Sequence, residues 1–294
     1  MISLAAWYYR ILLSENDLIE KINYFEVGQL DGNRHHEALV FLKNKHLPKW
    51  LSHSELYSCC DGTGTSLYKN IAVYKAISEA LERWAFYVTT ESNESNKFCF
   101  DINPSTTGMA AYPGITTKGA RKNAIVEASE RWALHEFWRG NLPVIEHETN
   151  IQNLLHYEIV SEMNKVKVSL VSYKTESQYL YGFAADRTLT ESFEHALVEL
   201  ARNIRVLNKF NKENINFNSF KDISDKRLIY FSTPEGNDLF NIKVQSAPKA
   251  PLTSPKLICD LEMKGPWNQY TKVWRYLYAD SYPDSETDHT IFMF

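Results

Sequence analysis

Two seven-residue segments are near-copies of each other and are rich in groups that bind metals and phosphates. The segment Glu79–Ala85 reads EALERWA and the segment Glu127–Ala133 reads EASERWA, so six of seven positions are identical. Each copy holds two glutamates three residues apart, with an arginine directly after the second. Carboxylate oxygens are ligands that Mg²⁺ accepts, and guanidinium groups match the geometry of phosphate oxygens. The repeat therefore suggests chemistry on a phosphorylated ligand.

Both copies fall in segments of helical periodicity, at about 68–90 and about 117–139. Apolar residues that recur every three or four positions predict a buried stripe on each helix, comprising Ile71, Tyr74, Ile77, Leu81, Trp84 and Val88 on the first, and Ile125, Ala128, Trp132 and His135 on the second. The polar residues fall on another face, comprising Lys75, Glu79, Glu82 and Arg83 on the first helix, and Asn123, Glu127, Glu130 and Arg131 on the second.

A third segment, at about 190–209, has the same two-faced pattern. Thr190 is the predicted N-cap of this helix. The apolar face is predicted to comprise Phe193, Leu197, Leu200, Ile204 and Leu207, and the polar face to comprise Glu191, His195, Glu199 and Arg202.

If the three polar faces converge, five carboxylates share one cleft, namely Glu79, Glu82, Glu127, Glu130 and Glu199. Five like charges require cations nearby, and Mg²⁺ suits a few carboxylates together with substrate phosphates. Arg83, Arg131 and Arg202 would then hold phosphate oxygens. For any one helix, a solvated face with ordinary ion pairs is the better explanation, but two copies and a third similar face favour a shared site. Spacing alone thus suggests a Mg²⁺–nucleotide site.

Other candidate motifs carry less information. The segment 58–66 reads as a polar turn; its glycines lack the pattern of a P-loop, although backbone N–H groups before a long helix can hold an anion. A di-iron bundle needs Glu-x-x-His, which none of the repeat glutamates provides. His35 and His36 have no third ligand at a matching spacing. The four cysteines, Cys59, Cys60, Cys99 and Cys259, are predicted to be free thiols.

The remaining pattern predicts an α+β fold in a single domain spanning 1–294. Predicted strands lie at 37–42, 97–102, 165–173, 179–185, 228–232 and 273–278. The segment 211–219 reads as a loop, and the C-terminal sixty residues as mostly loop and strand.

Composition narrows the classes of protein. Apolar residues make up 44% and charged residues 23% of the 294 residues, which excludes wholesale disorder. A formal net charge of −4 argues against nucleic acid as the ligand of a broad surface. No stretch approaches the roughly 20 apolar residues of a membrane span. We expect a cytoplasmic protein with neither a nucleic-acid nor a membrane partner.

The order and spacing of these motifs resemble the YcaO-domain family over about residues 58–210. In that family a Gly-rich segment precedes a helix with ExxER, a second helix carries another ExxER, and a third carries ExxQ after a Gly-containing strand. The corresponding residues here are Glu79, Glu82 and Arg83 in the first motif, Glu127, Glu130 and Arg131 in the second, and Glu199 and Arg202 in the third, after Gly182. The region at about 220–294 lies beyond the motifs.

The resemblance implies a fold and an activity. The fold is a YcaO-like α+β domain in which long helices pack on β-sheet around a cleft for ATP and Mg²⁺. Family members phosphorylate a peptide-backbone amide oxygen, so that a neighbouring Cys, Ser or Thr closes an azoline ring; others install thioamides or amidines. The implied metal ligands are Glu79, Glu82, Glu127, Glu130 and Glu199; the implied catalytic residues are Glu127, Glu130, Arg131 and Glu199; and the implied nucleotide-binding residues are Gly64, Ser66, Lys75, Arg83, Arg131 and Arg202.

The sequence also departs from the family pattern. Lys75 and Asn123 stand where the family often has Ser, Arg202 replaces the Gln of ExxQ, and the chain ends without a Pro-rich segment. These departures keep a non-catalytic scaffold subunit open beside the cyclodehydratase and the thioamide- or amidine-forming enzyme.

The partners implied by the resemblance are a ribosomally made precursor peptide and an E1-like, leader-binding protein, which we expect to be a separate chain. A flavin dehydrogenase in the same complex and a homo-oligomer stay open.

Overall fold

The computed structural model describes residues 4–14, 17–28, 30, 32, 34–47, 56, 60–208, 220–246, 254–279 and 288–292. The predicted loop at 211–219 and Cys59 lie outside these residues. Within the described part, no helix is both long and apolar enough to cross a membrane. Cys60, Cys99 and Cys259 form no disulfide with one another, in agreement with the prediction of thiols.

The strands form three antiparallel sheets. The first contains β1 (Ile19–Gly28), β2 (Arg34–Leu42) and β3 (Gly62–Ser66), in that order. The second has the order β4 (Met109–Tyr112), β10 (Lys272–Tyr278), β9 (Leu257–Met263). The third runs in chain order through β5 (Val144–His147), β6 (Leu154–Ile159), β7 (Lys167–Lys174) and β8 (Tyr179–Asp186).

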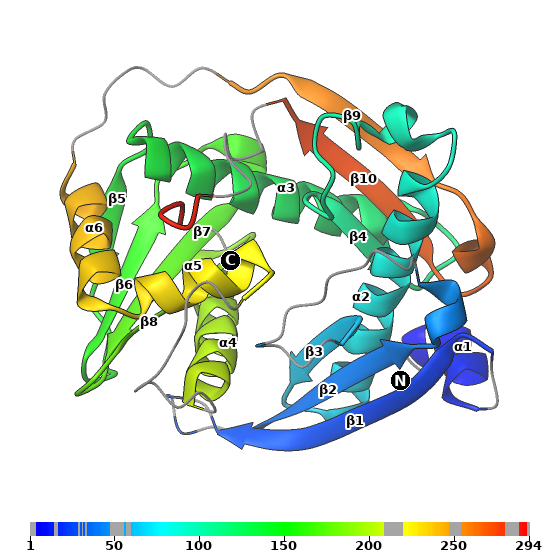
Figure 1. Ribbon diagram of the computed structural model, residues 1–294, viewed down its shortest axis with the longest axis horizontal. Helices are drawn as coiled ribbons and strands as arrows, with labels where there is room; N and C mark the ends of the chain where they lie inside the picture. The colour runs from blue at the N-terminus through cyan, green and yellow to red at the C-terminus, as the bar shows by residue number, and fades with distance from the viewer. Residues whose placement is uncertain are drawn as a thin grey trace.

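Three long helices alternate with these sheets. They are α2 (Lys69–Thr90), α3 (Lys118–Arg139) and α4 (Leu189–Asn208). Helix α2 packs on β2 and β3 and also contacts β4; α3 packs on β4 and β10 and contacts β8; α4 covers β7 and β8. Viewed as in Figure 1, the layers follow one another around a ring, and α4 returns to the neighbourhood of β1–β3. The polar faces of the three helices are thereby turned toward a common centre.

Small residues let each strand lie directly on its helix. A Cβ atom added at Gly62 would collide with the Ala76 carbonyl, and one added at Gly182 would collide with the Ala196 carbonyl. Gly62 and Gly182 both lie fourteen residues before the alanine that they face. Such close approach is available only where both surfaces are nearly without side chains.

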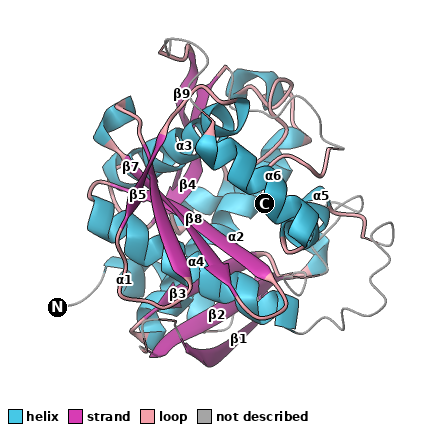
Figure 2. Ribbon diagram, turned by 90° about the vertical axis from the view of Figure 1, so that its left-hand side faces the viewer, coloured by secondary structure: helices cyan, strands magenta, loops and turns pink. Residues whose placement is uncertain are grey.

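The shorter helices close the remaining apolar surfaces. They are α1 (Leu4–Leu13), α5 (Ile223–Phe231) and α6 (Pro234–Gln245). Tyr9 and Leu12 of α1 join the core around α2, while Phe231 of α5 and Phe240 of α6 join the core around α3 and the third sheet. Figure 2 shows helices on both sides of the strands of the third sheet.

The three long helices confirm their predicted spans to within two residues, but details of their packing and capping differ. Ile71 and Val88, predicted to be buried on the first helix, are each 37% exposed; the residues of α2 that face β3 are Ala72, Ala76 and Ala80. The N-cap of α4 is Thr188 rather than Thr190: the Thr188 hydroxyl accepts a hydrogen bond from the Glu191 amide and donates one to the Glu191 carboxylate.

Four other predicted elements are wrong in part or in full. Residues 62–66, read as a turn, form β3, because their small side chains alternate between two faces of a sheet. The predicted aromatic strand at 97–102 is the end of a 3₁₀ helix followed by turns, and Cys99 has a left-handed φ of 57°. The predicted strand at 228–232 belongs to α5, and α6 lies in the region expected to be loop and strand. Asp222 and Thr233 cap these two helices.

Candidate functional site

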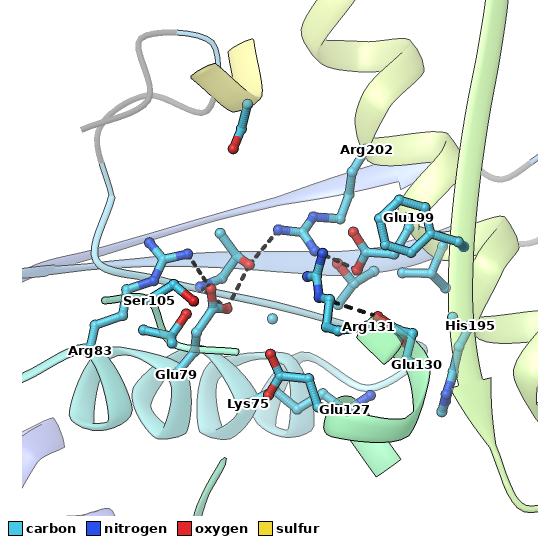
Figure 3. Close-up of a pocket in the computed structure, with 18 of the residues that line it drawn as sticks. Lys75, Glu79, Arg83, Ser105, Glu127, Glu130, Arg131, His195, Glu199 and Arg202 are labelled. Atoms are coloured by element: carbon cyan, nitrogen blue, oxygen red, sulfur yellow. Dashed lines mark hydrogen bonds and ion pairs between the residues drawn. The ribbon is translucent and has the colours of Figure 1, made fainter. Parts of the chain in front are cut away.

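A pocket of about 740 Å³ lies at the centre of the ring of layers. Its walls come from β3, α2, the loop before β4, α3, β8 and α4, so all three sheet–helix units contribute. Figure 3 shows that the labelled side chains of α2, α3 and α4 point into this common space. The pocket exists because segments more than a hundred residues apart in sequence meet here.

Four of the five predicted carboxylates line the pocket, namely Glu79, Glu127, Glu130 and Glu199. The fifth, Glu82, is not part of the lining. It lies beside the cluster, accepts a hydrogen bond from the Ala111 amide of β4, and interacts electrostatically with Glu127 and Glu79. The three polar faces therefore meet, with Glu82 behind the pocket wall.

The carboxylates occupy repeated positions within the three units. Glu79, Glu127 and Glu199 each lie seventeen residues after a small strand residue, which is Gly62, Ala110 or Gly182. Ala110 packs in one core cluster with Ala124 and Ala128 of α3, at the same spacing at which Gly62 faces Ala76 and Ala80. The same strand-on-helix geometry, used three times, places one glutamate per unit at the pocket.

Arginines neutralise part of this negative charge. Arg83 Nη2 lies 2.6 Å from Glu79 Oε1, and Arg202 Nη1 lies 2.6 Å from Glu199 Oε1. The Arg131 Nε to Glu130 Oε1 distance is longer, at 3.8 Å. Glu127 accepts no hydrogen bond from the part of the chain that the structure describes, and the opposite charges that act on it most strongly are those of Arg131 and Arg275.

Burial dominates the electrostatics of the carboxylates on α3. It raises the pKa of Glu127 to about 8, with Glu130 adding to the effect and Arg131 opposing it. Burial likewise raises the pKa of Glu130 to about 7, against Arg131 and a 2.8 Å hydrogen bond from the Ala185 amide. The pKa of Glu82 is also raised, by burial and by Glu127. The pocket is thus short of positive charge around α3.

Of the predicted nucleotide-binding residues, Lys75, Arg83, Arg131 and Arg202 line the pocket, and so does Gly64. Loss of surrounding water lowers the pKa of Lys75, while Glu199 and Asp186 raise it. Ser66 lies outside the lining and accepts a hydrogen bond from the Tyr68 amide at 3.3 Å.

The backbone at Gly64 does not offer the amides of a loop to an anion. Gly64 is a strand residue paired with Ala38, and its missing side chain allows β3 to approach Ala72 and Ala76 of α2. The anion-binding turn considered from the sequence is therefore wrong.

Sequence reasoning missed the threonines of β3. Thr63 and Thr65 are two residues apart, lie on the same side of the strand, and line the pocket. The Thr63 amide and hydroxyl both donate to Glu79 Oε2 at 2.8 Å. The Thr65 hydroxyl oxygen is buried and makes no hydrogen bond within the described residues. The alternation of glycine and threonine in GTGTS (62–66) is the sequence signal of a strand with both threonines on one face, and it would have indicated them.

A second group that the sequence did not reveal is the loop before β4. Pro104, Ser105 and Thr106 line the pocket. Arg275 of β10 is fully buried and holds this loop by donating to the carbonyl oxygens of Asn103, Ser105 and Thr107, at 2.8, 2.5 and 2.9 Å. Nothing in the local sequence around 275 indicates this contact, because its partners lie about 170 residues away.

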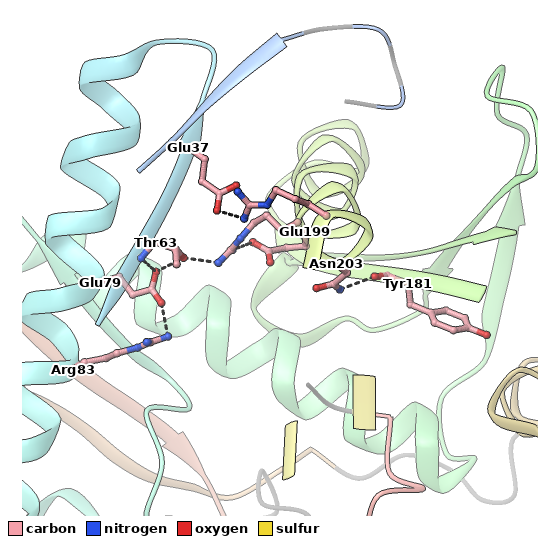
Figure 4. Close-up of polar contacts among 9 residues, drawn as sticks. Glu37, Thr63, Glu79, Arg83, Tyr181, Glu199 and Asn203 are labelled. Carbon is pink, nitrogen blue, oxygen red and sulfur yellow. Dashed lines mark hydrogen bonds and ion pairs between the residues drawn. The ribbon is translucent and has the colours of Figure 1, made fainter. Parts of the chain in front are cut away.

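The polar contacts also link the three units to one another. Arg202 of α4 donates to the Thr63 hydroxyl of β3, and one turn later Arg205 pairs with the buried Glu37 of β2 (Figure 4). These contacts close the ring between the third unit and the first.

Neither a protein-family model nor a curated protein matches the sequence. Solved structures do match. The structure of a YcaO protein from Methanopyrus kandleri, bound with AMPPCP and Mg²⁺, is similar with a TM-score of 0.60 and 14% identity over 94% of this chain and 89% of that one.

Two further structures agree. A heterocyclase in complex with substrate and cofactor matches with a TM-score of 0.58 and 13% identity over 94% of this chain, which spans about half of that protein (51%). The E. coli microcin synthetase complex with pro-MccB17 bound matches with a TM-score of 0.55 and 12% identity, over 87% of this chain and 86% of that one. The chain therefore has the YcaO-domain fold.

Proposed function

We propose that the chain is an ATP- and Mg²⁺-dependent enzyme that activates peptide-backbone amides. The observation that carries this proposal is the convergence of glutamates and arginines from α2, α3 and α4 on one pocket. A YcaO protein of the same fold is bound with AMPPCP and Mg²⁺, which supports the assignment. Such a set of carboxylates and guanidinium groups suits phosphoryl transfer, which depends on positioning and on charge neutralisation.

The residues of the pocket fit a magnesium nucleotide. No three His, Cys, Asp or Glu side chains of the described residues form a ready-made metal centre. A divalent ion would therefore need phosphate oxygens as additional ligands, which is how Mg²⁺ is commonly held. A bound magnesium ion would stabilise the charged form of Glu127, whose pKa is raised. The ligand would also give the Thr65 hydroxyl a hydrogen-bond partner, which it lacks within the described residues.

We assign roles to the residues on this basis. Glu79, Glu127 and Glu130 would hold Mg²⁺, and Glu82 would support Glu127 from behind the wall. Arg83, Arg131 and Lys75 would bind phosphate oxygens. Bound ATP and Mg²⁺ would supply the phosphoryl group and neutralise its charge. Thr65 would donate a hydrogen bond to the ligand, and the loop held by Arg275 would shield it from water.

The reaction that we propose is cyclodehydration of Cys, Ser or Thr in a ribosomally made peptide. The side-chain thiol or hydroxyl loses its proton as its sulfur or oxygen adds to the preceding amide carbon, and the amide oxygen takes the γ-phosphoryl group of ATP with release of ADP. Phosphate then leaves with the electron pair of the C–O bond, while the amide nitrogen loses its proton and forms the C=N bond of the azoline. ADP, phosphate and the azoline are the products. A thioamide- or amidine-forming reaction uses the same activation with a different nucleophile.

Mass spectrometry of the peptide tests this reaction. The chain, ATP, Mg²⁺, a leader-binding protein and a Cys-rich precursor are incubated together, once without and once with added sulfide as the sulfur donor of the thioamide reaction. Loss of one water per modified residue supports cyclodehydration, and exchange of oxygen for sulfur supports the thioamide alternative. An unmodified peptide and an unconsumed ATP pool would contradict both.

We further propose that the protein works in the cytoplasm with a leader-binding E1-like protein. The heterocyclase is solved with substrate, and the microcin synthetase is solved as a complex with its precursor bound. A flavin dehydrogenase that oxidises the azolines would belong to the same assembly. Co-purification of the three proteins with the precursor tests this composition.

A non-catalytic scaffold is the second candidate, and the Arg83–Glu79 and Arg202–Glu199 ion pairs favour it because they occupy potential metal ligands. The two functions differ in nucleotide binding. An enzyme binds ATP much more tightly with Mg²⁺ than without it, whereas a scaffold whose carboxylates stay paired shows no such difference. Calorimetric titration of ATP in the presence and absence of Mg²⁺ distinguishes them.

A further inference from the structure

The three units carry equivalent residues at one more position, and only one of the three is positively charged. Three residues after Glu79, Glu127 and Glu199 stand Glu82, Glu130 and Arg202. The first two of these are carboxylates, and the third is a guanidinium. Since the strand-on-helix spacing is the same in each unit, the three side chains start from corresponding points on their helices.

In each unit this side chain reaches a strand of the next unit around the ring. Glu82 of α2 accepts a hydrogen bond from the Ala111 amide of β4, and Glu130 of α3 accepts one from the Ala185 amide of β8. Arg202 of α4 donates to the Thr63 hydroxyl of β3. The position therefore joins the units in all three cases, but the charge that it brings to the pocket is reversed in the third.

Arg202 is also held tightly against the carboxylate of its own unit. Its Nη1 lies 2.6 Å from Glu199 Oε1, and its side chain is only 16% exposed. A charge-assisted hydrogen bond of this length in a partly desolvated site is strong. The Glu199 side chain is 41% exposed, so a divalent ion could reach it from the pocket, but there it would meet the repulsion of the guanidinium at a few ångströms.

We propose that Arg202 is a built-in cation that takes the place of a divalent metal ion beside Glu199. The pocket then binds one divalent ion fewer than it would with a neutral side chain at position 202. The remaining metal is bound by the carboxylates of α2 and α3. This inference rests on the proposed function as a Mg²⁺–nucleotide enzyme. It changes the role of Glu199, which orients Arg202 rather than binding metal.

Counting bound Mn²⁺ tests the inference without measuring activity. The chain is saturated with AMPPCP, Mn²⁺ is titrated, and free Mn²⁺ is followed by electron paramagnetic resonance. We expect Arg202→Gln to bind one Mn²⁺ more per nucleotide than the unchanged chain. Arg202→Lys keeps the positive charge and is expected to retain the original number. Arg121→Gln is the matched control, because Arg121 is an exposed arginine of α3 that pairs with Asp260 of β9 outside the pocket lining.

The outcomes separate this inference from the proposed function. Equal Mn²⁺ numbers in Arg202→Gln and the unchanged chain, with Mn²⁺-dependent nucleotide binding intact in both, overturn the inference alone. Nucleotide binding by the unchanged chain that does not respond to Mn²⁺ overturns the proposed function, and the inference with it. Should Arg202→Gln not fold, Glu199→Gln answers the same question: an unchanged Mn²⁺ number supports the inference, and the loss of one ion overturns it.

Discussion

Glu127 combines burial, like-charged neighbours and the lack of a hydrogen-bond partner among the described residues. Its pKa is raised to about 8, whereas Glu79 and Glu199 each have an arginine at 2.6 Å. A carboxylate in this condition gains most from an added cation, because its charged form is otherwise poorly stabilised. At the scale of single residues, Glu127 is therefore the side chain on which metal binding should depend most strongly.

The first prediction concerns this carboxylate. Glu127→Gln should weaken Mg²⁺-dependent ATP binding at least about tenfold, which corresponds to about 1.4 kcal/mol, and abolish ATP turnover. The substitution removes a charge that the fold stabilises poorly, so the ligand-free protein should be equally or more stable. Calorimetric titration and denaturant unfolding measure the two effects. Glu130→Gln should behave similarly.

Glu146→Gln is the matched control, because Glu146 is an exposed residue of β5 away from the pocket lining. Unchanged nucleotide turnover in both Glu127→Gln and Glu130→Gln would remove the basis for the assigned roles.

The second prediction is a pH dependence of stability. The folded-state pKa values of Glu127 and Glu130, about 8 and about 7, lie above their ordinary value of 4.5, so the folded chain binds more protons than the unfolded chain between these limits. Stability must therefore fall as pH rises through this range. His156, whose pKa burial lowers to about 4 from 6.5, acts in the opposite direction only below pH 6.5.

Unfolding measured between pH 6.5 and 8 isolates the glutamates. Over that window the ligand-free chain should lose stability with rising pH, and Glu127→Gln should reduce the slope by up to about 1.4 kcal/mol per pH unit. Identical slopes for the two proteins would show that the Glu127 carboxyl does not titrate in this range.

At the scale of elements, the site depends on how closely each strand lies on its helix. Gly62 and Gly182 leave no room for a side chain against α2 and α4. This contact fixes the distance between each strand and its helix. A small displacement of β3 or β8 would therefore change the position of Glu79 or Glu199 relative to the strand residues that line the pocket.

The third prediction follows from this contact. Gly182→Ala should destabilise the protein by about 1–3 kcal/mol, since the added methyl group forces β8 away from the Ala196 carbonyl. Gly28→Ala is the control, because nothing lies within 4 Å of a Cβ atom at that position. Denaturant midpoints of the two variants measure the difference. A Gly182→Ala protein as stable as Gly28→Ala would mean that β8 and α4 are not in the contact described.

At the scale of the whole molecule, the shorter helices pack against the ring of sheets and long helices. Tyr9 of α1 is buried in the core around α2, and Phe231 of α5 and Phe240 of α6 are buried in the core around α3 and the third sheet. The described part of the chain thus surrounds one pocket. A peptide that enters this pocket becomes ordered there, at a cost in conformational entropy.

The fourth prediction is that efficient peptide modification requires a partner. A protein that grips the leader converts entry of the core peptide into an intramolecular step, with an effective concentration of order mM for a short flexible tether. Purified chain, ATP, Mg²⁺ and precursor should therefore give little loss of water by mass spectrometry until the leader-binding protein is added. Efficient dehydration by the chain alone would contradict the requirement.

The sequence by itself determined the parts of the site that repeat along helices. Apolar and polar residues that alternate with a helical period predicted α2, α3 and α4, and they placed Glu79, Glu127 and Glu199 on the polar faces. These are local patterns, since a helix is specified by residues three and four positions apart. The recurrence of EALERWA as EASERWA was enough to suggest that the polar faces meet.

Tertiary structure alone decided what the repeated residues face. Small residues made β3 look like a turn, because a strand of Gly and Thr is stabilised by pairing with β2 and by contact with α2 rather than by its own propensity. Arg275 binds a loop about 170 residues away, and Arg202 binds Thr63 across the ring. Such contacts are set by which surfaces the packed layers bring together, and no local pattern encodes them.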